Sequence, residues 1–235
     1  MRNEASVCRA IRIHPSILNA DMLDLGRDLA IIKRGGGDGV HVDVMDGHFV
    51  RNLSMGPHIV ESIRPATRLA IDVHLMVTDP GKFVVPFLEA GTDSLTIHAE
   101  IRGPVARLLG EIRRRGARSG ISLKPGTPLS VLEPVLPHAD MVLLMTVDPG
   151  YGGQAFQGRV LAKIAALRRM AVRKGLPLDI QVDGGVTSAT ARAAVRAGAN
   201  VLVAGCSIFG ARDPVAALRS LRRIANDAAR AGMRE

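Results

Sequence analysis

The chain of 235 residues is predicted to form a single α/β domain, a (β/α)8 TIM barrel with helices outside a parallel sheet. Short apolar runs alternate with longer segments of helical period along the whole chain. There are eight such runs, roughly 29 residues per unit, and the length is near the ~250-residue norm of this barrel. No linker or change of composition divides the chain. An open doubly wound sheet is the alternative, but eight even units favour closure.

The elements follow in order along the chain. We expect a short N-terminal tail over 1–10 and the catalytic barrel over 11–235. The expected strands are the apolar runs 11–18, 39–45, 69–76, 94–98, 119–123, 141–147, 178–182 and 201–204. The expected helices are 20–34, 57–64, 80–90, 104–115, 129–136, 155–173, 188–197 and 214–231. Proline fits the first helical turn, and it stands at three expected helix starts: Pro80, Pro104 and Pro214. Glycine accepts the left-handed cap conformation, and it stands at four expected ends: Gly91, Gly116, Gly175 and Gly198.

Composition limits the classes of partner. The formal net charge of +9 favours an anionic partner, but an aromatic content of 3% gives few surfaces for stacking nucleic-acid bases. The arginine groups within 113–118, 168–174 and 219–223 fall late in expected outer helices, where positive charge is favourable. We therefore expect no nucleic-acid partner, although a basic nucleic-acid-binding protein is the remote alternative.

Cysteine usage and hydropathy favour the cytoplasm. Two cysteines, Cys8 and Cys206, are too few for a disulfide framework. No apolar run approaches the ~18 residues of a transmembrane helix, so no membrane partner is expected.

The strongest candidate site lies where the second expected strand ends. In a strand, residues two apart share a face, so His41, Asp43 and Met45 point to the same side. Buried polar groups must be paired, and at the C-terminal end of a barrel strand they usually belong to an active site.

Two other expected strands end in the same way. Asp72, His74 and Met76 share a face of the third strand, and Asp183 ends the seventh. His41, Asp43, His74 and Asp183 would therefore meet at one mouth of the barrel. Two imidazoles and two carboxylates favour a divalent transition metal such as Zn²⁺ or Fe²⁺ over an all-oxygen Mg²⁺ site. We expect ordinary structural roles for the other five histidines, although His14 and His98 are candidates for supporting the site.

Glycine-rich loops follow the last three expected strands. Glycine lets backbone N–H groups approach an anion, and the loops after strands seven and eight are the usual phosphate site of such barrels. Three such loops side by side indicate a phosphate-binding site. The residues concerned are Gly150, Tyr151, Gly152, Gly153, Gly184, Gly185, Gly205 and Cys206.

Three methionines end strands on the predicted interior: Met45, Met76 and Met145. Methionine ordinarily fills the core. Beside carboxylates and a metal, its thioether could instead cover a flat, electron-rich intermediate and exclude water.

These motifs together resemble the ribulose-phosphate 3-epimerase family, over nearly the whole chain. The matching segments are His14-Pro-Ser-Ile-Leu-Asn-Ala-Asp21, Val42-Asp-Val-Met-Asp-Gly-His-Phe-Val50, Asp72-Val-His-Leu-Met-Val77, Pro149-Gly-Tyr-Gly-Gly-Gln154, Val182-Asp-Gly-Gly-Val186 and Val203-Ala-Gly205. The resemblance implies a (β/α)8 barrel that interconverts D-ribulose 5-phosphate and D-xylulose 5-phosphate.

The resemblance also implies roles for individual residues. His41, Asp43, His74 and Asp183 would hold one divalent metal ion per subunit, Zn²⁺ or Fe²⁺ in preference to Mn²⁺ or Co²⁺. Asp43 and Asp183 would also be the catalytic acid–base pair. Ser16, His74, the three methionines and the eight residues of the glycine loops would bind the sugar phosphate. The family commonly forms homo-oligomers, so we expect one here.

Three residues depart from the family's pattern. Arg51 stands where proline is frequent, Tyr151 replaces a common phenylalanine, and Cys206 replaces a serine beside the phosphate. None belongs to the expected metal-ligand set. The nearest alternative function is a sibling epimerase for a six-carbon substrate such as D-allulose 6-phosphate.

Overall fold

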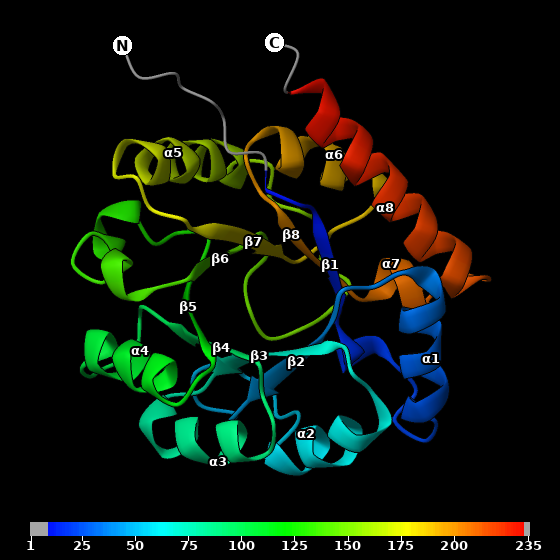
Figure 1. The fold of residues 1–235 in the computed structure, drawn as a ribbon, viewed down its shortest axis with the longest axis horizontal. Helices are drawn as coiled ribbons and strands as arrows, with labels where there is room; N and C mark the ends of the chain where they lie inside the picture. The colour runs from blue at the N-terminus through cyan, green and yellow to red at the C-terminus, as the bar shows by residue number, and fades with distance from the viewer. Residues whose placement is uncertain (1–8, 233–235) are drawn as a thin grey trace.

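Eight parallel strands form the centre of the molecule in the computed structural model, which describes residues 9–232 (Figure 1). Neighbouring strands pair in the order β1-β8-β7-β6-β5-β4-β3-β2, and an isolated parallel bridge between Ser16 and His41 joins β1 to β2. The (β/α)8 barrel expected from the sequence is confirmed. The strands are β1 (Arg12–Pro15), β2 (Gly39–Met45), β3 (Ala70–Met76), β4 (Ser94–His98), β5 (Arg118–Leu123), β6 (Met141–Met145), β7 (Asp179–Asp183) and β8 (Val201–Ala204). The expected tail, 1–10, lies mostly outside the described residues.

Helices surround this barrel (Figure 1). The α-helices are α1 (Leu25–Gly35), α2 (Pro57–Ile63), α3 (Val84–Glu89), α4 (Val105–Arg114), α5 (Val160–Arg173), α6 (Ser188–Arg196), α7 (Cys206–Phe209) and α8 (Pro214–Ala231). The main hydrophobic core lies between strands and helices, where alternate strand residues such as Val42 and Val44 are buried. Within residues 9–232, no helix is both long and apolar enough to cross a bilayer.

The helix expected over 129–136 is wrong. The chain forms two short 3-10 helices there, Leu129–Leu132 and Leu136–His138. Pro134 explains the break, since it lacks an N–H and its ring would collide with the carbonyl of Ser130 in a continuous α-helix.

Several helices start later than expected. α1 starts at Leu25, because the Asp24 carboxylate caps it by accepting from the Arg27 N–H. α5 starts at Val160 instead of residue 155, which leaves 146–159 as a long loop. The single-turn helix α7, right after β8, was not expected. These changes all lengthen or shape loops at the C-terminal ends of strands.

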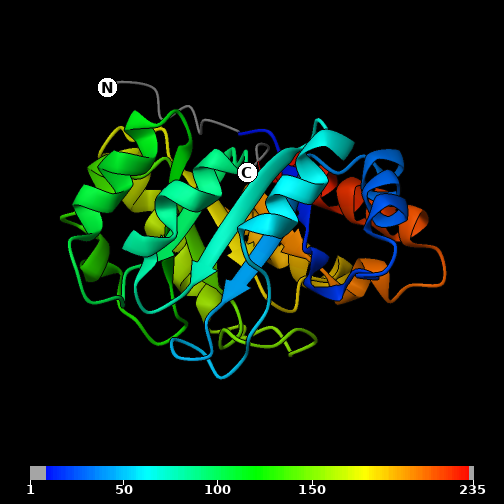
Figure 2. The same ribbon diagram turned by 90° about the horizontal axis from the view of Figure 1, so that it is seen from below.

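All eight strands point the same way, so their C-terminal ends share one mouth. In Figure 2 the arrows of β2 and β3 point toward the loops coloured for residues near 50 and 150, which extend from this end of the barrel. Side chains at strand ends and in these loops are thereby brought together.

Ion pairs gather around Asp179 at the opposite end of the barrel. The Asp179 side chain is 5% exposed. Its carboxylate accepts from Arg9, Arg12 and Arg118, and the Asn200 amide donates to it at 2.8 Å. Asp179 therefore ties β7 to β1 and β5, across the base of the barrel.

Asp179→Asn is expected to destabilise the fold by about 2–3 kcal/mol, since it leaves three neighbouring guanidinium groups without their shared anion. The thermal midpoint should fall by roughly 4–10 °C in a melting experiment. Asp227→Asn, the same change at an exposed position of α8, is the control and should leave the midpoint unchanged. Equal midpoints for the two variants would contradict the role given to Asp179.

Candidate functional site

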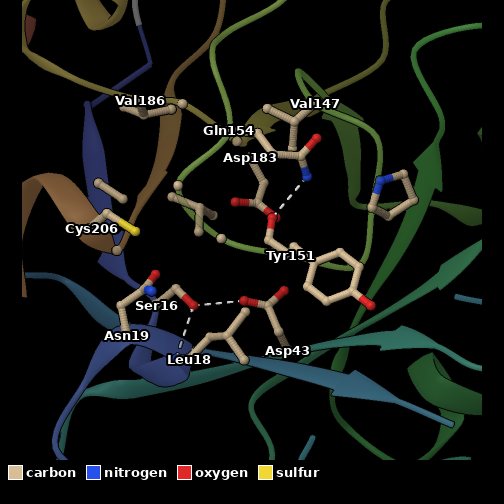
Figure 3. Close-up of a pocket in the computed structure, with 18 of the residues that line it drawn as sticks. Ser16, Leu18, Asn19, Asp43, Val147, Tyr151, Gln154, Asp183, Val186 and Cys206 are labelled. Carbon is tan, nitrogen blue, oxygen red and sulfur yellow. Dashed lines mark hydrogen bonds between the residues drawn. The ribbon is translucent and has the colours of Figure 1, made fainter. Parts of the chain in front are cut away.

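A pocket of about 320 Å³ opens at the C-terminal mouth of the barrel (Figure 3). It brings together residues from the first, second, third, sixth, seventh and eighth strands and the loops after them. The expected residues that line it are Ser16, Asp43, Met45, Met76, Met145, Gly150, Tyr151, Gly152, Gly153, Asp183, Gly184, Gly185, Gly205 and Cys206. His41 and His74, which are fully buried, do not line this pocket but face Asp43.

Asp43 is the centre of the polar contacts on β2. Its Oδ2 accepts from the Ser16 hydroxyl at 2.6 Å, the bond drawn in Figure 3. Its Oδ1 lies 3.4 Å from both His41 Nε2 and His74 Nδ1. The parallel register pairs Asp43 with His74, which explains why side chains from two strands converge.

Asp183 completes a four-residue group. One possible ligand atom from each of His41, Asp43, His74 and Asp183 lies within 4.8 Å of all the others. Figure 3 shows the Asp43 and Asp183 side chains pointing into the pocket from two sides. The four residues singled out in the sequence therefore do meet, and they form a group that could hold a metal ion.

The chemistry of this group fits a divalent cation. His41 Nε2 is buried, faces the group and has no hydrogen-bond partner among the described residues. No Lys or Arg of the described chain lines the pocket, so neither carboxylate is paired with a lysine or arginine there. Two imidazole nitrogens and two carboxylate oxygens are a donor set for Zn²⁺ or Fe²⁺.

Asp72 orients His41 by contacting the ring nitrogen that does not face Asp43. Asp72 Oδ2 lies 2.9 Å from His41 Nδ1 and 3.0 Å from His14 Nδ1, and it accepts from the Gln181 amide at 2.5 Å. Ser94 donates to the other oxygen at 2.8 Å. A carboxylate that accepts from His41 Nδ1 leaves Nε2 as the nitrogen available to a ligand, as is usual for metal-binding histidines.

The two pocket carboxylates have opposite tendencies to ionise. Burial raises the pKa of Asp183 to about 7, and the negative charge of Asp43 adds to this effect. Burial would also raise the pKa of Asp43, but the imidazoles of His41 and His74, each 3.4 Å from its Oδ1, outweigh it and hold that pKa well below its usual value. Such a difference between neighbouring carboxyls is typical of an acid and a base that work as a pair.

Glycine is required in the loop after β7. Gly184 and Gly185 have φ of +112° and +64°, where other residues are strained. A Cβ on Gly184 would lie 2.3 Å from a Val147 methyl carbon, and one on Gly185 would lie 2.5 Å from the Phe156 backbone nitrogen. The loop can therefore take this close-packed shape only with glycine.

Two hydrogen bonds join the loop after β2 to the loop after β6. The Tyr151 hydroxyl donates to the Arg51 carbonyl at 2.5 Å, and the Asn52 amide donates to the Gly150 carbonyl at 2.8 Å. Tyr151 therefore binds the backbone of Arg51, not its side chain. Cys206, the third residue that departs from the family's pattern, is exposed and lines the pocket.

Some residues at the site were not expected from the sequence. Asn19 lines the pocket and packs against Gly152 and Gly205, whose added Cβ atoms would lie 3.0 and 2.3 Å from its side chain. The alternation placed Asp72 on the same strand face as His74, but its role in binding His41 and His14 was not expected. His14 and His98 are not ordinary core residues, because one bonds to Asp72 and the other to His74.

The fold and this site define a class of protein: a (β/α)8 barrel with a group of His and Asp residues that could hold a metal ion and a glycine-lined pocket at the strand ends. The sequence model of the ribulose-phosphate 3 epimerase family matches residues 12–209. The chain belongs to this family.

Named relatives agree with this assignment. A ribulose-phosphate 3-epimerase of Bacillus subtilis is 46% identical over 213 residues, which are 90% of this chain and 98% of the relative. A chloroplastic ribulose-5-phosphate-3-epimerase of Arabidopsis thaliana is 44% identical over 214 residues, or 90% and 76% of the two chains.

Solved structures of low sequence identity share the fold. KGPDC from Streptococcus mutans has a TM-score of 0.67 at 14% identity, over 93% of this chain and 99% of that one. A 3-hexulose-6-phosphate synthase from Salmonella typhimurium has a TM-score of 0.66 at 17% identity, over 93% and 100%. At these identities the likeness concerns the barrel alone.

Proposed function

We propose that this protein is an epimerase that interconverts D-ribulose 5-phosphate and D-xylulose 5-phosphate by moving a proton at carbon 3. The observation that carries the proposal is the pair of carboxylates, Asp43 and Asp183, that enter one pocket from two strands beside two imidazoles. The names of the relatives supply the substrate.

Epimerisation needs two proton carriers, because a single base tends to return the proton to the face that it came from. One of the two Asp residues takes the proton from carbon 3, and the other delivers a proton to the opposite face. The unequal pKa values of Asp43 and Asp183 support a division of roles, in which Asp183 holds a proton more readily than Asp43. The roles exchange with the epimer that is bound.

His41, Asp43, His74 and Asp183 are the residues that would hold a divalent metal. When bound, such an ion would stabilise the negative charge that develops on the substrate's ketone and hydroxyl oxygens. Ser16 donates to Asp43 and so orients the carboxylate at the pocket floor. Met45, Met76 and Met145 supply apolar walls that exclude water from the reacting carbons.

The glycine loops after β6, β7 and β8 would bind the phosphate, with Cys206 and Tyr151 beside them. A phosphate held there fixes the far end of the sugar and so orients carbon 3 between the carboxylates. The backbone is the expected ligand, since the pocket lining within the described chain contains no Lys or Arg.

A comparison of two substrates tests the proposal. A coupled assay should show turnover of D-ribulose 5-phosphate with kcat/KM at least about tenfold above that of D-allulose 6-phosphate. That ratio corresponds to ~1.4 kcal/mol of discrimination. Faster turnover of the six-carbon sugar would assign the chain to the sibling activity, and turnover of neither would overturn the proposal.

The finer points of the proposal concern domain, assembly and location. Residues 11–235 would form the catalytic domain of a cytoplasmic homo-oligomer that carries one Zn²⁺ or Fe²⁺ per subunit. Leu23 is 98% exposed and its neighbour Met22 is 46% exposed, so association of copies could cover them. Light scattering would measure the mass, and a monomer at assay concentration would contradict the assembly.

A further inference from the structure

Three side chains in contact, His74, His98 and Glu100, form a line from the candidate metal site to the loop after β4. His74 Nε2 lies 2.9 Å from His98 Nε2 on β4, and His98 Nδ1 lies 2.9 Å from Glu100 Oε2. Both imidazoles are fully buried, and their ring centroids lie 4.9 Å apart with the ring planes inclined at 30°. The proposed reaction makes no use of His98 or Glu100.

The hydrogen positions along this line follow from the groups around Glu100. Its Oε1 accepts from the Lys124 backbone N–H at 2.7 Å and from the Thr127 hydroxyl at 2.5 Å. A carboxylate accepts and does not donate. Glu100 Oε2 therefore requires a hydrogen on His98 Nδ1.

The hydrogen on His98 Nδ1 determines where the hydrogen between His98 and His74 lies. A neutral imidazole with its hydrogen on Nδ1 has a lone pair on Nε2. The two facing Nε2 atoms can share only one hydrogen, so it must be on His74. His74 Nδ1 then has a lone pair and faces the group 3.4 Å from Asp43 Oδ1.

Asp43 alone would favour the opposite arrangement, with the hydrogen on His74 Nδ1. The distances decide between the two. The contact with His98 is 2.9 Å, a normal hydrogen bond, whereas the contact with Asp43 is 3.4 Å and weak. The line of side chains from β4 therefore determines the tautomer of His74.

We propose that Glu100 and His98 are positioning residues that hold His74 in the tautomer with an unprotonated Nδ1, ready to bind a divalent metal. The inference rests on the proposed metal site and extends it by two residues. Asp72 does for His41 in one step what Glu100 does for His74 through His98.

Glu100→Gln should reverse the direction of both hydrogen bonds in this line of side chains, because glutamine has nearly the shape of glutamate but carries an NH₂ donor. The donors Lys124 N–H and Thr127 O–H hold the amide oxygen on their side, so the new NH₂ group faces His98 Nδ1. His98 must then carry its hydrogen on Nε2 and donate to His74. The His74 hydrogen moves to Nδ1, the atom that would bind the metal.

The first measurement is NMR of the metal-free protein, with long-range ¹H–¹⁵N correlations that distinguish imidazole tautomers. Wild type should show His98 with Nδ1–H and His74 with Nε2–H, and Glu100→Gln should show both reversed. The second is Zn²⁺ affinity by competition with a chelating dye, which should fall about 10–100-fold in Glu100→Gln. Glu61→Gln is the matched control, since Glu61 bonds His58 at the same 2.9 Å on the exposed face of α2.

His74 with Nδ1–H in the wild type would overturn the inference, as would Zn²⁺ affinity of Glu100→Gln within twofold of the control. The wild-type spectrum decides even if Glu100→Gln does not fold. Wild type that lacks epimerase activity but shows the expected tautomers and affinities would overturn only the proposed function. Active wild type with an unchanged Glu100→Gln affinity would overturn only this inference.

Discussion

Asp43→Asn and Asp183→Asn are each expected to lower turnover of D-ribulose 5-phosphate by about 10²–10⁴-fold, the range typical of a lost acid or base. Asparagine has the shape of aspartate but cannot take or give the proton. Both side chains lie at strand ends and outside the main hydrophobic core, so the fold should survive. Steady-state kinetics at saturating metal, with bound metal measured in each variant, gives the effect.

Solvent exchange distinguishes the two carboxylates. Each variant retains one base, which can still remove the proton on its own side and return it. In deuterated buffer, one variant should therefore incorporate deuterium into D-ribulose 5-phosphate and the other into D-xylulose 5-phosphate, without interconversion. Incorporation into both epimers by one variant would show that a single base suffices.

Asp227→Asn serves as the control for charge, since Asp227 is exposed on α8. Its turnover should equal that of the wild type. Near-normal turnover in either Asp43→Asn or Asp183→Asn, with metal bound, would contradict the acid–base assignment.

Local sequence pattern was sufficient to find all eight strands and the four residues of the candidate metal site. The first strand was expected to reach Leu18, but it ends at Pro15 and a 3-10 helix follows over Ile17–Asn19. The period of two on β2 and β3 put His41, Asp43 and His74 on inward faces, and the parallel sheet brought those faces to one mouth. Both inferences need only the residues next to one another in the sequence and the rule that the C-terminal ends of barrel strands meet at one mouth.

The sequence made His98 a candidate for supporting the site, but its contact with His74 could not be predicted from a local pattern. Its contact with His74 depends on the register of β3 against β4, which pairs His74 with Thr96 and leaves His98 one step further along the inward face. Glu100 acts only because Lys124 and Thr127, after β5, bind its other oxygen. Register and loop contacts of this kind arise from tertiary packing, not from a local period.

Tertiary packing also explains why α5 starts later than the sequence predicts. Apolar residues from 155 onward suggest a helix, but the Gln157 N–H donates to the Thr146 carbonyl at 2.7 Å, and Thr146 in turn donates to the Asp183 carbonyl at 2.8 Å. These bonds hold 146–159 against β7, as a loop over the pocket. A tertiary contact thus replaces the helix that local propensity favours.

Removal of metal is expected to have an effect as large as the loss of either carboxylate. Without a cation, the developing negative charge on the substrate would face Asp43 and Asp183, and in the described chain no Lys or Arg lines the pocket to offset it. Protein treated with chelator should lose at least about 10²-fold in turnover, and Zn²⁺, Fe²⁺, Mn²⁺ or Co²⁺ should restore it.

Melting of the protein gives a second measure that does not depend on substrate. A metal that binds only the folded state at 100 times its Kd adds about 2.7 kcal/mol to the free energy of unfolding. Zn²⁺ should therefore raise the thermal midpoint of the wild type and of the Glu61→Gln control. It should not do so for His41→Gln, which loses the buried Nε2 that has no other partner within the described residues. Full activity in protein shown to contain no metal would contradict the metal site, because the pocket would then need another source of positive charge.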